Sequence, residues 1–328
     1  MTWLVWRQHR VQFLAGAALL AAFAVLIVIT GLQTASQYHS ALVACTANHS
    51  CANLSSTLFL GSHAVGFLVI MTLGAPLLVG LFWGAPLVAA EAEAGTTQFA
   101  WMQSVTRRHW LVVKIGWMLL AAAVWGGVIS ALVTWWSGPD NAQQLDAFNP
   151  GRFDIMGLVP VAYSLFAVAL GIAAGTLLRR VLPAMAVTLA GFIAVRAAVA
   201  LWLRPHYMTA VTVFYKVTSG FTPPGSYWRL ASGIVGPNGL AVDQNTNGAV
   251  LAGVPVTYLP ASCAPASARG AFTVQPSCAR ALTQFHGFLT YQPAERYWAF
   301  QGIETGIFLV LAAALIAVTA AVLLRHDA

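Results

Sequence analysis

Six stretches of about 20 mostly apolar residues divide this sequence, and each is long enough to cross a bilayer as a helix. They cover residues 12–32, 61–83, 115–136, 155–177, 184–203 and 301–324. Charged residues make up 8% of the chain, against roughly 25% in an ordinary soluble domain. So few charges cannot cover a water-exposed surface of this size. The sequence therefore predicts an all-α polytopic membrane protein with six transmembrane helices.

The distribution of Lys and Arg predicts the orientation of these helices. With a cytoplasmic N-terminus, the short inner segments carry Arg7, Arg10, Arg107, Arg108, Lys114, Arg179, Arg180 and Arg325. The basic residues of the outer segments are spread over a much greater length, and long translocated loops count little in this rule. We therefore expect both termini in the cytoplasm. The first span is read as a retained anchor, because its apolar run exceeds the 7–15 residues of a cleaved signal peptide.

The first ten residues, MTWLVWRQHR, place Trp3 and Trp6 beside Arg7. Aromatic and basic residues next to an apolar span are typical of a helix that lies in the membrane interface. We therefore expect an interfacial helix over 1–10 before the first span begins.

The segment 204–300 is the longest one between two spans, and it predicts an extracellular cap. It contains the turn sequences PPGS, GPNG and NTNG, together with Val, Tyr and Trp residues that can form a small core. We expect a folded cap with some β-structure. The transmembrane domain would then comprise residues 1–203 and the last span.

All four cysteines fall in predicted outer segments, where the compartment permits disulfides. Cys45 and Cys51 lie in the first of these segments, and Cys263 and Cys278 lie in the cap. The local pairs 45–51 and 263–278 are the simplest of three connectivities. Four free thiols are the alternative.

Enzymatic motifs are missing from the sequence. Its two lysines, Lys114 and Lys216, are followed by Ile115 and Val217, so the chain has no G-K-[ST] phosphate-binding loop. It also has no H-E-x-x-H and no G-x-S-x-G motif. We expect neither a catalytic site, nor a metal site, nor a cofactor in this chain. The formal charge of +7 is scattered rather than gathered in a stripe, which favours lipid headgroups over nucleic acid as its partners.

Three charged residues fall inside or beside the apolar spans. Arg196 lies about 12 Å from the outer end of the fifth span at 1.5 Å per residue, and Asp154 and Glu304 lie near the outer ends of the fourth and sixth. A buried arginine needs a partner in the membrane. We expect Arg196 to pair with Glu304 or Asp154 and to tie these outer ends together.

Residues 84–114 form the one sizeable cytoplasmic loop in this topology. Gly95 and Thr96 provide a break, and TQFAWMQSV (97–105) can form about two turns of helix on the membrane surface with Phe99 on its apolar side. Such a helix is either an ordinary connector or a docking site for a partner.

The loop sequence GAPLVAAEAEAGTTQFAWMQSVTRRHWLVVK (84–114) resembles the first cytoplasmic loop of bacterial ABC-2 type transporter permeases. Many of these carry E-x-E-x-G-T, then W-x-Q-S-V-[ST]-R, then W-L-x-x-K. The resemblance extends to MTWLVWRQHR (1–10), LLRRVLPAM (177–185), LRPHY (203–207) and YQPAERYWAFQGIE (291–304).

This resemblance implies a permease subunit of the bacterial plasma membrane that dimerises and binds two copies of a separate ATPase, which would hold the ATP and Mg. The loop 84–114 would be the coupling helix, and Trp3 and Arg7 match the interfacial segment. The residues that match the loop motif are Glu91, Glu93, Gly95, Thr96, Gln103, Ser104 and Arg107.

Closure of the ATPase pair would drive alternating access and export an amphipathic or hydrophobic compound. A second hypothesis is a non-transporting membrane scaffold or sensor whose extracellular cap binds a ligand.

Overall fold

The structure, a computed structural model, describes residues 2–48, 63–95, 107–137, 150–224, 227–242, 250–260, 263 and 276–325. Two compact units divide the chain. The helical unit comprises Met1–Tyr207 and Tyr297–Ala328, and the inserted unit comprises Met208–Arg296.

The helical unit confirms the predicted number of spans, because the described part of the chain holds six helices long and apolar enough to cross a membrane. They begin with α1 (Thr2–Asn48), and the second consists of α3 (His63–Val79), a π-helical turn η1 (Gly80–Gly84) and α4 (Pro86–Glu93). The third and fourth are α6 (Arg107–Trp136) and α9 (Val159–Leu178), with the short α8 (Pro150–Phe153) between them. The fifth consists of α10 (Val181–Ala198), η2 (Val199–Leu203) and η3 (Arg204–His206), and the sixth is α12 (Tyr297–Arg325).

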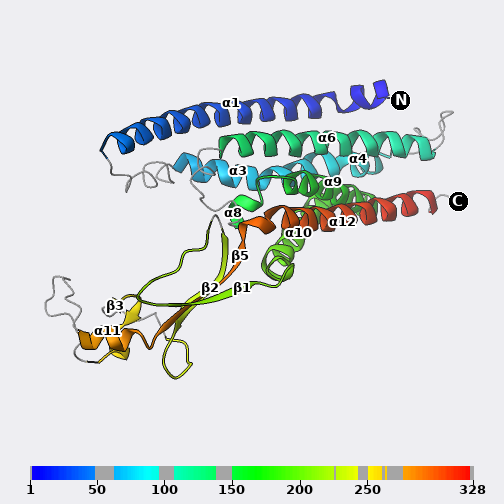
Figure 1. Ribbon diagram of the computed structural model, residues 1–328. Coiled ribbons are helices and arrows are strands. Elements are labelled where there is room, and N and C mark those ends of the chain that lie inside the picture. The colour runs from blue at the N-terminus through cyan, green and yellow to red at the C-terminus, as the bar shows by residue number, and fades with distance from the viewer. Residues whose placement is uncertain are drawn as a thin grey trace. The chain divides into compact units, whose positions relative to one another are not determined.

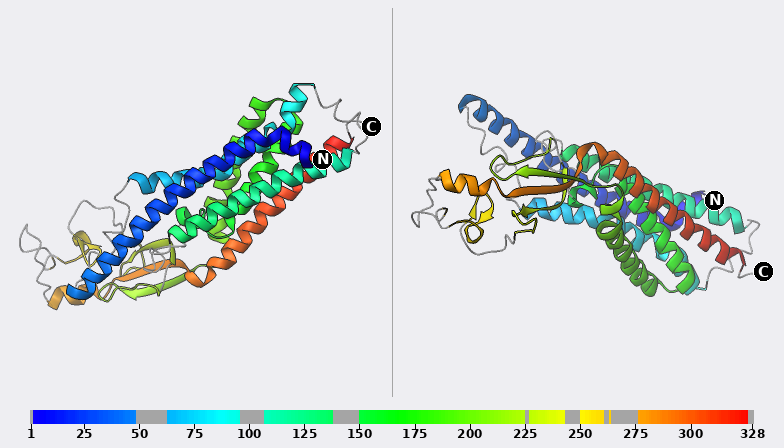
Figure 2. Two further views of the ribbon diagram at one scale, coloured as in Figure 1. Left: turned by 90° about the horizontal axis from the view of Figure 1, so that it is seen from above. Right: turned by 60° about the horizontal axis from the view of Figure 1, so that its bottom comes forward.

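The first turn of α1 and the last turn of α12 lie at the same end of the helical unit (Figures 1 and 2). We call it the near end and the opposite one the far end.

The first helix differs from the prediction of an interfacial helix over 1–10 followed by a span over 12–32. One unbroken helix, α1, runs from Thr2 to Asn48. The sequence offers no Gly or Pro before Gly16 and none between Gly31 and Asn48. Without such residues nothing ends the helix at the polarity changes near residues 10 and 32. Hydropathy located the apolar part of the helix but not its ends.

The predicted loop 84–114 is also shorter than expected. The sequence PLVAAEAE consists of a proline suited to the first helical turn and of good helix formers, so α4 continues to Glu93. The next helix, α6, already begins at Arg107. The predicted surface helix 97–105 lies outside the described residues.

Helix α9 is the most buried of the six spans and lies at the centre of the helical unit, in contact with α3, η1, α4, α6, α10 and α12. Gly171 allows a close approach to a neighbour. A Cβ at that position would lie 2.6 Å from both the nitrogen of Ala85 and the carbonyl oxygen of Gly80. Small residues of this kind let two helical backbones meet inside a bilayer.

The inserted unit contains a three-stranded antiparallel sheet in the order β1-β5-β2. Its strands are β1 (Val211–Lys216), β2 (Tyr227–Val235) and β5 (His286–Pro293). The smaller elements are the paired β3 (Val250–Leu251) and β4 (Val254–Pro255), the 3₁₀ turns η4 (Val256–Tyr258) and η6 (Ala294–Arg296), and α11 (Pro276–Leu282).

The core of the inserted unit gathers around a disulfide between Cys263 and Cys278, whose Cα atoms are 5.2 Å apart. Ile234, Val254 and Phe285 are buried in the same cluster. Residues of β2, of β4 and of the segment before β5 thus pack in one covalently tied core.

Candidate functional site

Six polar side chains meet at the far end of the helical unit: four belong to α9, α10, η3 and α12, and two lie in the turns after α8 and η3. This far-end charge cluster consists of Asp154, Tyr163, Arg196, Arg204, Tyr207 and Glu304. Two guanidinium groups face two carboxylates, so the formal charges balance.

The centre of the cluster is the ion pair between Arg204 and Glu304, which are 1% and 0% exposed. Arg204 Nε donates to Glu304 Oε2 at 2.8 Å, and its Nη2 donates to Oε1 at 2.6 Å. The guanidinium also lies 4.5 Å from the centre of the Phe153 ring. A planar guanidinium that uses two nitrogens on one carboxylate is a geometry that lysine cannot reproduce.

Arg196 reaches Asp154 rather than Glu304. Its Nη2 lies 3.0 Å from Asp154 Oδ2, and its Nη1 donates to the carbonyl oxygen of Leu73 on α3 at 2.9 Å. Arg204 Nη2 donates to the other oxygen of Asp154. Asp154 therefore joins the two arginines, and Leu73 links α3 to the cluster.

Two tyrosines donate hydrogen bonds to Glu304. The hydroxyl of Tyr163 lies 2.5 Å from Oε1, and that of Tyr207 lies 3.3 Å from Oε2. Burial, and then the nearby carboxylate, raise the pKa of Tyr207 above its ordinary value. The phenol therefore stays protonated and acts as a donor.

The far-end charge cluster is suited to hold helices together rather than to perform chemistry. Every carboxylate faces an arginine, and the contacts join α3, α9, α10, η3 and α12. The sequence reasoning missed Arg204, which it assigned to the cap. Its distance of eight residues from Arg196, about two helical turns, was the signal that both could reach the same carboxylates.

At the near end, a buried ion pair joins the two helices that flank residues 96–106. Lys114 Nζ on α6 lies 2.5 Å from Glu91 Oε1 on α4, and the two side chains are 2% and 15% exposed. Glu93 Oε2 accepts a hydrogen bond from the backbone nitrogen of Val181 at 3.1 Å, where α10 begins. An acidic side chain at a helix N-terminus is favoured by the unpaired N–H groups there.

The other residues predicted for partner docking are only partly described. Gly95 has φ of +66° and follows the end of α4, as the left-handed residue that ends many helices does. Arg107 is the first residue of α6. Thr96, Phe99, Gln103 and Ser104 lie outside the described residues.

Of the residues predicted for the interfacial helix, Trp3, Trp6 and Arg7 all belong to α1. Arg7 is exposed.

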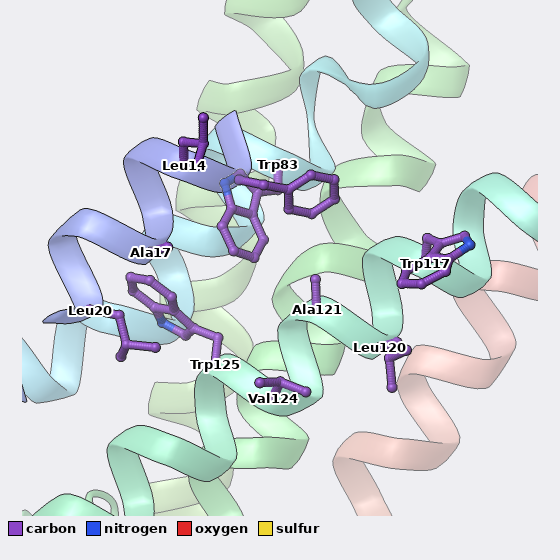
Figure 3. A pocket seen from close by; sticks show the side chains of 10 residues that line it. Leu14, Ala17, Leu20, Trp83, Trp117, Leu120, Ala121, Val124 and Trp125 are labelled. Atoms are coloured by element: carbon purple, nitrogen blue, oxygen red, sulfur yellow. The ribbon is translucent and has the colours of Figure 1, made fainter. Parts of the chain in front are cut away.

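A groove of about 370 Å³ lies between α1, η1 and α6. All ten lining residues are aliphatic or aromatic and none is charged (Figure 3). Trp83 lines the groove and makes two T-shaped contacts, its ring centre being 5.7 Å from that of Phe13 and 5.6 Å from that of Trp125. Leu14 and Val124 stand at its open side and are 59% and 55% exposed. The groove therefore opens on the apolar surface of the helical unit.

Cys45 is disulfide-bonded, like the pair in the inserted unit. Cys51 lies outside the described residues. Within the residues that the structure describes, no three His, Cys, Asp or Glu side chains gather closely enough to hold a metal ion.

The model of the ABC-2 membrane transporter related family matches residues 17–204, from α1 to the start of η3. No curated protein and no solved structure matches the chain.

Proposed function

The chain belongs to the ABC-2 membrane transporter related family, and on this premise we propose that it is the permease subunit of an exporter for amphipathic or hydrophobic compounds. The observation that carries the proposal is the family match over residues 17–204, which covers five of the six candidate spans. The protein is a multi-pass membrane protein, and we place it in the bacterial plasma membrane.

The energy would come from a separate ATPase, of which two copies bind a permease dimer and hold ATP and Mg. In this proposal the near end faces the cytoplasm, and residues 97–105 form the coupling helix. Binding and hydrolysis of ATP move that helix and so alternate the access of the transport path. A second copy of this chain completes the path.

The near-end contacts support this role for the loop. The Glu91–Lys114 pair braces the two helices that carry residues 96–106, and Glu93 ties the first of them to α10. A push on the loop would therefore reach α4, α6 and α10 together. At the other end of the unit, the far-end charge cluster would hold four spans as one block while they move.

Co-purification with the ATPase tests the proposal. The chain should bring down an ATP-binding protein, and Gln103→Ala or Arg107→Ala should lower the ATP turnover of the complex. Gln284→Ala is the matched control, because Gln284 is exposed in the inserted unit. A chain that purifies without an ATPase, or whose complex hydrolyses ATP equally well in all variants, would contradict the proposal.

Labelling of intact cells tests the orientation. A membrane-impermeant maleimide should modify Leu240→Cys in the inserted unit, where Leu240 is 70% exposed. It should modify Arg180→Cys at the near end only after lysis. The reverse pattern would place the coupling loop outside the cell and remove its access to ATP.

The alternative is a membrane scaffold or sensor whose inserted unit binds a ligand outside the cell. The observation in its favour is the covalently tied core of that unit. A sensor would fold and respond without an ATPase, so the co-purification experiment separates the two functions.

A further inference from the structure

The groove between α1, η1 and α6 contains a buried polar group without a hydrogen-bond partner among the described residues. Trp125 lines the groove and is 8% exposed. Its ring nitrogen is buried and has no hydrogen-bond partner among the described residues. Figure 3 shows the Trp125 ring reaching toward Ala17 and Leu20 of α1. The N–H group is thus held among apolar side chains.

The depth of Trp125 in the membrane makes this donor unusual. It lies near the middle of the span Val112–Trp136, where a bilayer offers no water to accept a hydrogen bond. A buried donor without an acceptor is unfavourable, so most such groups in proteins are paired. The nitrogen has almost no accessible surface, so the Trp125 ring would have to turn it toward the groove before an acceptor on a bound molecule could satisfy it.

We propose that this groove binds a neutral lipophilic compound whose carbonyl oxygen accepts a hydrogen bond from Trp125 Nε1. The apolar body of the compound lies against Trp83 and Phe13, which offer flat aromatic faces. The compound is neutral because no lining side chain carries a charge, and an unpaired charge is costly at this depth. That the compound is the exported cargo rests on the proposed function, whereas its binding does not.

A membrane phospholipid does not fit the same requirements. Its ester oxygens lie at the edge of a hydrocarbon core about 30 Å thick, so they are about 15 Å from the level of Trp125. The acyl tail that reaches this level has no acceptor. A compact carbonyl compound that dissolves in the hydrocarbon core has one.

Photolabelling with benzophenone tests the proposal on the full-length protein in lipid nanodiscs. Benzophenone is neutral and apolar, carries one carbonyl oxygen, and reacts with nearby C–H bonds when illuminated. Peptide mapping should place the label on residues 13–20 and 117–125. Excess unlabelled acetophenone should compete, while ethylbenzene, which has the same ring without the carbonyl, should compete about threefold to tenfold less, the range expected for one hydrogen bond.

The variant Trp125→Phe keeps an aromatic ring but removes the donor. It should lower labelling of these two segments by about threefold to tenfold. Trp202→Phe is the matched control, because Trp202 is 78% exposed and lies outside the groove; labelling should not change. Even labelling of all lipid-facing helices, equal competition by both compounds, or unchanged labelling of Trp125→Phe would overturn the proposal. The competition arm uses the unaltered protein and so holds if the variant fails to fold.

The two proposals fail separately. If the groove is labelled specifically but the chain binds no ATPase, the groove site stands and the export function is contradicted. An ATPase complex that responds to Gln103→Ala but shows no specific labelling would retain the permease and overturn the groove site.

Discussion

The side-chain oxygen of Gln301 on α12 accepts a hydrogen bond from the backbone nitrogen of Val159, the first residue of α9, at 3.1 Å. The same oxygen accepts from Leu158 at 3.0 Å, and the side-chain nitrogen donates to the carbonyl oxygens of Phe153 and Met156. The first N–H groups of a helix have no partner within that helix. Gln301 supplies one from another span, so the start of the central helix depends on α12.

Replacing Gln301 with leucine should destabilise the helical unit. The buried backbone groups around Val159 lose their partners, and each such loss costs about 1–3 kcal/mol. We expect the apparent Tm in detergent to fall by at least about 5 °C. Gln33→Leu, an exposed site on α1, is the control and should leave the Tm nearly unchanged. Equal melting temperatures for both variants would show that the hydrogen bonds from Gln301 to the start of α9 are dispensable.

Removing one member of the Arg204–Glu304 pair should be more harmful than removing both. Arg204→Leu or Glu304→Leu alone leaves a buried charge without its partner, which costs about 3–5 kcal/mol. The double variant keeps Arg196 and Asp154 as a balanced pair, so it should recover part of the folded yield. Size-exclusion chromatography of the four proteins measures this.

The control for that cycle is Arg280→Leu, since Arg280 is exposed in the inserted unit. It should change the folded yield little, alone or combined with Glu304→Leu. Losses that simply add for Arg204 and Glu304 would contradict a direct energetic coupling between them.

A methyl group at Gly171 should separate α9 from its neighbour. The added Cβ would lie 2.6 Å from backbone atoms of Gly80 and Ala85, which cannot turn aside as a flexible side chain does. We expect Gly171→Ala to cost about 1–3 kcal/mol. Gly127→Ala on α6 has open space within 4 Å and should be neutral or stabilising by up to about 1 kcal/mol. Thermal unfolding of the two variants should therefore shift in different directions, and equal shifts would exclude close packing as the cause.

The number of spans could be predicted because a membrane requires length and apolarity, and both are local properties of the sequence. The ends of the helices could not be predicted in this way. α1 continues past residue 32 because helix formation depends on the backbone and on the absence of Gly and Pro, not on hydropathy. The same reason explains why α4 continues to Glu93.

The sequence indicated which charged residues meet in the far-end charge cluster, but not which carboxylate pairs with which arginine. The reasoning that a buried arginine needs a carboxylate named Arg196, Asp154 and Glu304 as residues that meet. Which carboxylate Arg196 takes depends on Arg204, whose position in the helical unit follows from the three-dimensional path of η2 and η3. Gln301 gave no signal either, since a side chain that caps another helix is visible only once the two helices are placed together.

Exchanging the charges of Glu91 and Lys114 together should be less harmful than reversing either charge alone. Glu91→Lys or Lys114→Glu would bring two like charges together at the site of the present 2.5 Å contact. Little water is there to screen their repulsion. Each single variant should lose folded protein and, in the proposed complex, ATP turnover. The double variant restores opposite charges across the same two helices and should recover a measurable part of both.

Lys216→Glu is the control for this reversal, because it makes the same charge change at an exposed position of β1. It should affect neither folded yield nor ATP turnover. If the double variant were as impaired as the worse single variant, Glu91 and Lys114 would not act as a unit. Another contact would then have to hold α4 and α6 together. If it recovered folding but not ATP turnover, the identity of each charge would matter to the partner that docks there.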